Sequence, residues 1–392
     1  MLAALEQCWP PFVLVAGLLL IGLVAGEDGL FDAAAGFIER LPGSPLALFA
    51  ACCLALAVTT ALLNLDTAAV FLTPVAIGVA RKRGVSEAPF LYGSLFMANA
   101  SSLYLPGSNL TNLLVLSSRG ISGGTFLARM LPAALAATLV TAVGVACLHR
   151  RALCGSGRSR EGSGRGGTSS GGCGADAGPL RWAEAGSVRG ADAGRVRRSD
   201  AGPGARPRRA PQFGVGLAGV IAAAVLMVVL RNAALPVLAV GIAATVWRLC
   251  EGRVSSDAVW RRLGAPILLG LFLLAVALGG LARATGFPGH AVASLGVPAT
   301  AAVAALSTVL INNLPAAVLL SAGHVAHPTA LLIGLDVGPN LAVSGSLSAL
   351  LWWRSASAMD ARPSALVCSA QGILLAPLAI VAALALSAAV HV

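Results

Sequence analysis

A polar interruption inside a long apolar segment constrains this chain most. Residues 334–354 read GLDVGPNLAVSGSLSALLWWR, a run with five polar side chains before its terminal arginine: Asp336, Asn340, Ser344, Ser346 and Ser348. Lipid offers no hydrogen bonds, so a spanning helix that breaks here must turn its freed backbone toward protein or a water-filled cavity. Broken helices of this kind are typical of transport sites.

The composition is that of a polytopic membrane protein. Of the 392 residues, 57% are hydrophobic and 11% are charged, whereas soluble domains contain about 25% charged residues. The net charge of +11 comes largely from one loop, since 13 arginines and only five acidic residues lie between His149 and Gln212. Basic loops stay on the cytoplasmic side of a membrane. We therefore interpret this charge as topology rather than as nucleic-acid binding, the alternative use of a basic segment.

A re-entrant hairpin is predicted early in the chain. Residues 46–63 and 68–80 are apolar, and a polar tip with Asn64, Asp66 and Thr67 separates them. Two half-length helices that meet at a polar tip favour a hairpin over two full spans. The basic residues 81–83 hold both of its ends on the cytoplasmic side. Two ordinary short spans joined by a polar loop are the alternative.

The first broken helix is predicted at 89–118. Pro106 and Gly107 supply the break, and the polar wall follows directly: Ser108, Asn109, Thr111 and Asn112. A proline inside a helix removes a backbone hydrogen bond, and such breaks point to a binding site. Residues 126–148 then return the chain to the cytoplasm as an uninterrupted span.

The rest of the chain completes an all-α architecture of about eight spans plus two hairpins. Ordinary spans are predicted at 11–25, 213–230, 234–247, 265–281 and 365–390, and an amphipathic interfacial helix at 29–41. A second hairpin is predicted from 291–310 and 316–322, with Asn312 and Asn313 at its tip. The second broken helix is 327–353.

Two halves of the chain repeat this order. The pattern N-x-x-x-A-A-V-x-L occurs at 64–72 and again at 312–320. Around the breaks, Asn99 aligns with Asp336 and Thr111 with Ser348. Counting spans from the cytoplasmic loop brings the two hairpins in from opposite sides, which is the signature of an inverted repeat.

The repeats define three segments. An N-terminal membrane repeat is predicted at 1–148, a disordered cytoplasmic linker rich in glycine and arginine at 149–212, and a C-terminal membrane repeat at 213–392. The first repeat lacks two spans that 213–247 supply in the second.

Two carboxylates are candidates for proton coupling. Asp66 and Asp336 are the acidic residues that we place inside apolar segments, and both lie at predicted breaks. Ionisable groups within a membrane are costly and mark ion or proton paths. For Asp66, helix capping is the alternative role, because Thr67 and the apolar run after it resemble a helix start.

Neutral hydrogen-bonding groups form the rest of the candidate site. They are Asn64, Thr67, Asn99, Ser108, Asn109, Thr111, Asn112, Asn312, Asn313, Asn340, Ser344, Ser346 and Ser348. Hydrogen bonding between helices is the alternative role for these groups. The four breaks contain no lysine or arginine, which favours a small neutral polyhydroxy solute or a bare cation over a polycarboxylate. The chain has no nucleotide-binding motif and no metal-ligand spacing, so we expect no cofactor and no catalytic residues.

The segments around these breaks resemble one transporter family. LNLDTAAVFLTPVAIGVARKRG, ANASSLYLPGSNLTNLLV, LSTVLINNLPAAVLL and GLDVGPNLAVSGSLSALLWWR look like the arsenical pump (ArsB-type arsenite efflux) family of the ion transporter superfamily. The resemblance implies a carrier of the inner membrane that exports arsenite and antimonite as neutral trihydroxides in exchange for protons. It places the site between two hairpin tips and two broken helices. It leaves open a cytoplasmic ATPase subunit as a partner, and a homodimer.

Two departures from that family concern the scaffold and the coupling. Members usually have two more N-terminal spans, and many have a carboxylate where this chain has Asn99. Proton coupling therefore falls to Asp336 and Asp66. The competing hypotheses are a sodium- or proton-coupled carrier of another small solute or anion, and a non-transporting membrane scaffold. Sodium dependence without arsenite transport would identify the former.

Overall fold

All regular structure in the described part of the chain is helical. The computed structural model describes residues 2–117, 121–154 and 214–390. Five helical stretches are long and apolar enough to cross a membrane: α1 (Leu2–Glu27), α3 (Pro45–Leu62), α7 (Gly123–Leu148), Ser256–Thr285 and α18 (Ala365–Val390). Three shorter apolar helices accompany them: α9 (Val215–Val229), α10 (Ala234–Cys250) and α14 (Val297–Ile311). The predicted all-α polytopic architecture is confirmed.

The breaks of the first half lie where the sequence predicts them. The interfacial helix α2 (Leu30–Arg40) leads into α3, and α4 (Leu65–Lys82) follows directly after Asn64. The broken helix consists of α5 (Ala88–Ala100), two 3-10 turns, η1 (Ser101–Leu103) and η2 (Pro106–Ser108), and α6 (Leu110–Leu116). The chain then returns through α7.

The second half repeats this order after two additional helices. Behind α9 and α10 come α11 (Ser256–Leu263), α12 (Ala265–Thr285) and α13 (Phe287–Ala293). The second hairpin is α14 and α15 (Asn313–Leu320). The second broken helix consists of α16 (Pro328–Val337), η5 (Gly338–Leu341), η6 (Val343–Gly345) and α17 (Leu347–Ser357). By order along the chain, α1 corresponds to α12, α2 to α13 and α7 to α18, whereas α9 and α10 have no counterpart among the described helices of the first half.

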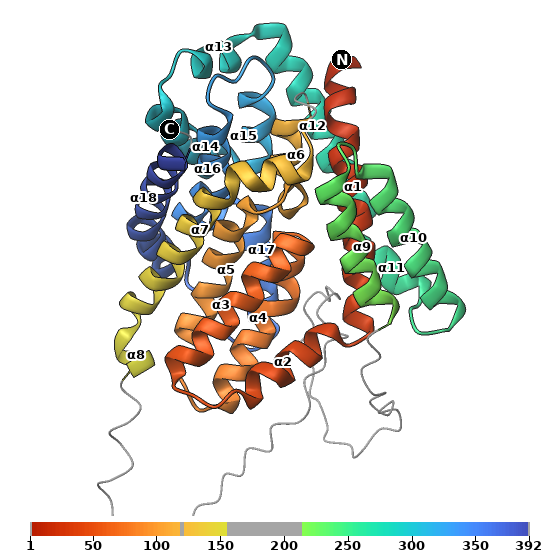
Figure 1. Cartoon of the computed structure of the whole chain (residues 1–392), viewed down its shortest axis with the longest axis vertical. Coiled ribbons are helices and arrows are strands. Elements are labelled where there is room, and N and C mark those ends of the chain that lie inside the picture. Colours follow the sequence, from red (N-terminus) through yellow and green to blue (C-terminus); the bar gives the residue numbers. More distant parts are fainter. Residues whose placement is uncertain (1, 118–120, 155–213, 391–392) are drawn as a thin grey trace, which may run out of the picture.

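The two hairpins enter the molecule from opposite ends. Figure 1 shows α3 and α4 in the lower half of the view and α14 and α15 in the upper half. The second arm of each hairpin packs on the broken helix of the other half, since α4 lies against α17 and α15 lies against α6. The repeats therefore interlock at their breaks, and this arrangement favours hairpins over four ordinary spans.

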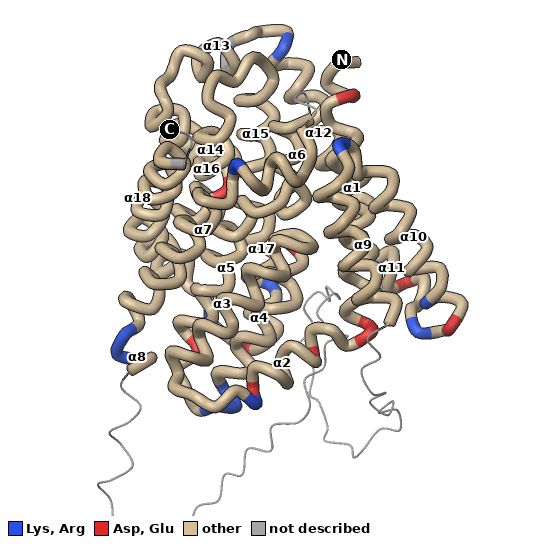
Figure 2. The backbone as a smooth tube through the Cα atoms, viewed as in Figure 1, with Lys and Arg blue, Asp and Glu red and all other residues tan. Residues whose placement is uncertain are grey.

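Basic side chains gather at the end where the first hairpin opens. Figure 2 shows blue segments below α3 and α4 and at α8 (Arg150–Cys154). Arg81, Lys82 and Arg83 end α4, and α7 ends just before Arg150. The positive-inside rule predicts that this end faces the cytoplasm. With that orientation the second hairpin is predicted to enter from the outside.

A buried ion pair connects the two halves near this end. Asp28, just after α1, accepts hydrogen bonds from Arg248 Nη2 of α10 at 2.7 Å and from the Gly216 amide of α9 at 2.8 Å. The side chains of Asp28 and Arg248 are 3% and 4% exposed. A Cβ at Gly216 would lie 2.7 Å from the Ala25 Cα atom, so only glycine permits this approach. Helix α1 thus packs between α9, α10 and α12.

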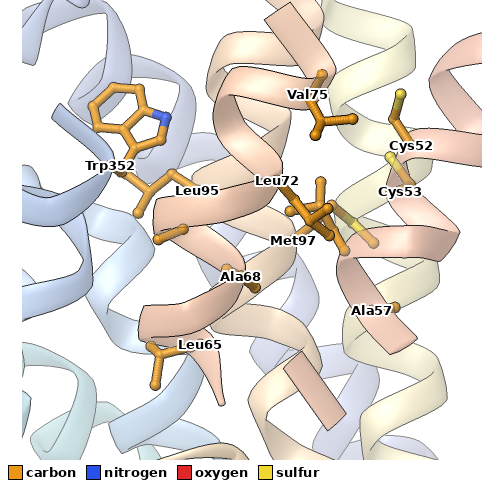
Figure 3. Close-up of a cluster of buried hydrophobic side chains, with 14 of the residues drawn as sticks. Cys52, Cys53, Ala57, Leu65, Ala68, Leu72, Val75, Leu95, Met97 and Trp352 are labelled. Carbon is orange, nitrogen blue, oxygen red and sulfur yellow. The ribbon is translucent and has the colours of Figure 1, made fainter. Parts of the chain in front are cut away.

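The first hairpin contributes its apolar face to the core. Figure 3 shows Cys52, Cys53 and Ala57 of α3 beside Val75 of α4 and Met97 of α5. Both cysteines are 4% exposed, and both are free thiols. The sequence allows adjacent thiols either a packing role or affinity for a thiophilic solute, and their apolar surroundings favour packing.

The structure differs from the sequence prediction at several boundaries. Helix α1 begins at Leu2 rather than at residue 11, because two prolines at positions 10 and 11 are accommodated inside it. Residues 287–293 form the separate helix α13, so the second hairpin begins at Val297 rather than at 291. Residues 150–154 of the predicted linker are helical. Residues 155–213 lie outside the described residues, and the three-segment division of the chain stays a prediction.

Candidate functional site

Asn64 organises the tip of the first hairpin. It is the N-cap of α4, and its Oδ1 accepts a hydrogen bond from the Thr67 amide at 2.7 Å. Asn64 and Thr67 are buried, at 2% and 3% exposure. A cap of this kind satisfies one of the free amides of a helix start. The Nδ2 atom of Asn64 is buried without a hydrogen-bond partner in the described structure.

Asp66 lies in the first turn of α4 and is half-buried. A carboxylate is favourable in the first turn because it faces the positive end of the helix dipole. No hydrogen bond given by the described residues links Asp66 to Asp336. Asp66 is thus less buried than Asp336, which has no exposed surface.

The polar side chains of the first break hold its irregular backbone. Ser108 Oγ accepts from the Leu105 amide at 3.1 Å and lies 3.2 Å from the Ala61 carbonyl at the end of α3. Asn112 Nδ2 donates to the Ser102 carbonyl at 2.7 Å. The break is thereby attached to the first hairpin. These bonds replace the helical ones that Pro106 and the turns remove.

Asp336 joins the two broken helices. It lies in the last turn of α16 with no exposed surface. Its Oδ1 accepts from Asn109 Nδ2 and from Thr111 Oγ1, each at 2.8 Å. Ser102 and Asn112 lie beside the same carboxyl group. Its Oδ2 is buried without a hydrogen-bond partner among the described residues, as is Asn112 Oδ1.

A neutral counterpart lies at the repeat-equivalent position. Asn99, in the last turn of α5, donates to Asn340 Oδ1 at 2.8 Å and accepts from Ser348 Oγ at 3.4 Å. Asn340 donates in turn to the Phe96 carbonyl at 3.1 Å. All three amide and hydroxyl residues are buried. Each broken helix therefore accepts a hydrogen bond from a hydroxyl group of its repeat partner. The acceptor is Asp336 in the second half and Asn99 in the first half.

The second tip satisfies its own polar groups. Asn312 Nδ2 donates to the Ser344 carbonyl at 3.1 Å, and Ser344 Oγ donates to the Val309 carbonyl at 3.2 Å. Asn312 has a φ of 74° and a ψ of 155°, a combination outside the left-handed helical region that is found almost only for glycine. Ser346 caps α17 and lies 2.8 Å from Ser348, oxygen to oxygen. Asn313 begins α15 and is buried.

The predicted residues thus fall into three groups. One surrounds Asp336, one surrounds Asn99, and the two tips form the third. Thr60, which the sequence prediction does not include, is fully buried near the end of α3, and its hydroxyl has no partner among the described residues. The available signal is its spacing, since Thr60 precedes Asn64 by four residues as Thr308 precedes Asn312. His324 is exposed beyond α15, away from these groups. Among the described residues no group of three or more histidine, cysteine or acidic side chains could hold a metal ion.

Comparison with known proteins supports a transporter. A 46 kDa membrane protein of Mycobacterium leprae is 27% identical over 146 residues, which are 37% of this chain and 34% of that protein. An uncharacterized transporter of Mycobacterium tuberculosis is 28% identical over 128 residues, 32% of this chain and 30% of that protein. The chain thus spans about a third of the length of these relatives.

A solved structure supports the fold. The YdaH transporter of Alcanivorax borkumensis, described as having an unusual topology, superposes with a TM-score of 0.56 at 13% identity and covers 100% of this chain and 87% of that one. At this identity the likeness concerns the fold alone. These comparisons agree with the ion transporter superfamily and with a multi-pass membrane protein. The model of the citrate transporter family, CitMHS, matches residues 3–353, and the chain belongs to that family of secondary transporters.

Proposed function

We propose that this protein is a proton-coupled transporter in which Asp336 carries the coupled proton. The observation that supports this is the unpartnered Oδ2 of a fully buried carboxyl group. Asp336 takes part in none of the ion pairs given for the described residues. A carboxylate buried without a countercharge bears a large desolvation cost, which protonation removes. Release of that proton restores the charge that Asn109 and Thr111 solvate through Oδ1.

The pattern of free hydrogen-bonding atoms indicates the class of solute. Asp336 Oδ2 and Asn112 Oδ1 accept hydrogen bonds, and both lack donors. A solute rich in hydroxyl groups brings such donors, whereas a carboxylate brings further acceptors. We therefore propose export of arsenite and antimonite as neutral trihydroxides, in exchange for protons, with resistance to metalloids as the consequence. This proposal places the carrier in the inner membrane.

Citrate, or a related carboxylate, is the second candidate. The family to which the chain belongs carries the name of citrate transporters. A carboxylate would depend on amide donors such as those at the start of α4, because the breaks contain no lysine or arginine. Sodium coupling belongs to this candidate, since a cation could accompany the anion. A cytoplasmic ATPase subunit and a homodimer are proposals that rest on the family resemblance alone.

Transport into everted membrane vesicles tests these proposals. Arsenite and citrate are offered separately, each with and without an imposed pH gradient and with sodium or potassium as the salt. We expect arsenite uptake that depends on the pH gradient and not on sodium. Citrate uptake without arsenite uptake would replace the first candidate by the second. Arsenite uptake that ignores the pH gradient would contradict the coupling role of Asp336.

A further inference from the structure

Thr60 and Thr308 occupy equivalent places in the two hairpins but differ in their hydrogen bonds. Each lies four residues before the asparagine of its tip, Asn64 or Asn312, and each is fully buried. Thr308 Oγ1 donates to the Ala305 carbonyl at 2.7 Å. Thr60 Oγ1 has no partner in the described structure.

The residue that begins the break of each half differs as well. Ser101 begins η1 and aligns with Gly338, which begins η5. A Cβ added to Gly338 would lie 3.0 Å from Thr308 Oγ1 and 2.5 Å from the Ala305 Cα atom. The second break therefore packs its bare backbone on the hairpin. The first break has a serine at this place, and Ser101 Oγ is also buried without a partner.

The tip asparagines complete the contrast. Asn312 Nδ2 donates to the Ser344 carbonyl, but Asn64 Nδ2 has no acceptor in the described structure. Thr60, Asn64 and Ser101 are all at most 2% exposed, and α3, which carries Thr60, packs against both α4 and η1. Buried polar groups without partners are rare in native structures, and each such group calls for a binding partner such as a water molecule, an ion or a ligand. At the second tip the same places are satisfied by protein.

We infer that Thr60, Asn64 and Ser101 form a subsite at the first hairpin tip that takes an oxygen atom of the transported solute. The donor set fits such an atom: one amide donates, and two hydroxyls donate or accept. The subsite adjoins the Asp336 group, because Ser102 follows Ser101 in η1 and lies beside that carboxyl. This inference rests on the proposed transport function and applies to either candidate solute. It also makes the first tip, and not the second, the one that recognises the solute.

Conservative variants test the subsite against its repeat equivalent. KM and maximal rate are measured in everted vesicles for arsenite and for citrate with wild type, Thr60→Val, Thr60→Ser, Ser101→Ala and Thr308→Val. Valine keeps the volume of threonine and removes the hydroxyl. We expect KM to rise about tenfold for Thr60→Val and Ser101→Ala, the effect of losing one hydrogen bond. Thr60→Ser and Thr308→Val should stay within about twofold of wild type. Thermal unfolding in detergent checks that each variant folds, and Ser101→Ala carries the test if Thr60→Val does not fold.

The outcomes separate this subsite from the proposed function. Unchanged KM for both Thr60→Val and Ser101→Ala, with transport intact, would leave the function standing and reduce the three groups to a water site. An equal rise for Thr60→Val and Thr308→Val would assign the effect to hairpin packing and overturn the subsite. A changed dependence on sodium with unchanged KM for the solute would replace it by a cation site. Absence of transport of either solute by wild type would overturn the function and the subsite together.

Discussion

The hydroxyl of Thr111 in the first repeat donates to the carboxyl of Asp336 in the second repeat across 2.8 Å. Ser348 and Asn99 make the reciprocal contact at 3.4 Å. The two broken helices therefore hold each other through equivalent positions that differ in one respect, since only Asp336 can exchange a proton.

Asp336→Asn should abolish coupling to the pH gradient while preserving the fold. Asparagine keeps the oxygen that accepts from Asn109 and Thr111, but it cannot carry a proton. We expect the rate of uptake driven by the pH gradient to fall at least about tenfold, which corresponds to a free-energy difference of ~1.4 kcal/mol or more. Asp66→Asn is the matched control, because Asp66 is half-buried in the first turn of α4. Equal losses for both variants would refute the special role of Asp336.

Asn99→Ala should destabilise the protein. The change removes the donor to Asn340 Oδ1 and the acceptor of Ser348 in a fully buried place. Each polar group left unsatisfied costs about 1–3 kcal/mol. Thermal unfolding in detergent measures the loss. Ser117→Ala removes a hydroxyl from an exposed residue at the end of α6 and should change stability by less than about 0.5 kcal/mol; similar shifts for both would show that the Asn99 bonds contribute little.

Arg248→Met should be among the most damaging changes outside the candidate site. It leaves Asp28 buried without its cationic partner, and breaking a buried pair in this way costs about 3–5 kcal/mol. Lys82 pairs with Glu39, and the side chain of Lys82 is 53% exposed. Lys82→Met should therefore cost at most about 1 kcal/mol of stability. Unfolding temperatures of the two variants measure the difference, and a loss for Arg248→Met no larger than that for Lys82→Met would contradict the structural role of the buried pair.

Gly372→Ala should disturb the second break from the outside. A Cβ at this position of α18 would lie 1.7 Å from the Asn340 carbonyl oxygen, so α18 or η5 must move. We expect loss of both thermal stability and transport. The control is Gly270→Ala in α12, where a Cβ meets nothing within 4 Å and alanine gains up to about 1 kcal/mol in a helix. Normal transport by Gly372→Ala would show that the position of Asn340 is unimportant.

Thiol labelling should confirm the orientation. Cys250 ends α10 at the basic end of the molecule and is exposed. A membrane-impermeant maleimide should therefore react with it in everted vesicles and spare it in right-side-out vesicles, in a variant without the other cysteines. A cysteine at the last residue of α12, introduced as Thr285→Cys, should react in right-side-out vesicles and be spared in everted ones. Labelling of both positions from the same side would overturn the assigned topology.

The helices and their breaks are accessible from sequence because the bilayer imposes them. Apolar stretches must be helical in lipid, and prolines, glycines and amides within them mark where helices stop. The start of α4 is recognisable for the same local reason, but its cap is Asn64 and not Asp66, the residue for which the sequence suggests capping. The first residues of α1 and the separate helix α13 were out of reach, because packing of α1 on α9, α10 and α12 and of α13 on α15 depends on distant partners.

What the sequence determines by itself is thus the class of protein, the order of the hairpins and broken helices, and the residue types at the breaks. The tertiary structure alone decided the hydrogen-bond partners. Asp336 meets Thr111 across 225 positions of sequence, and Thr60 lacks the bond that Thr308 makes. The physical reason is that a polar group in a membrane protein must find its partner within the fold, so its role depends on which distant segments pack against it.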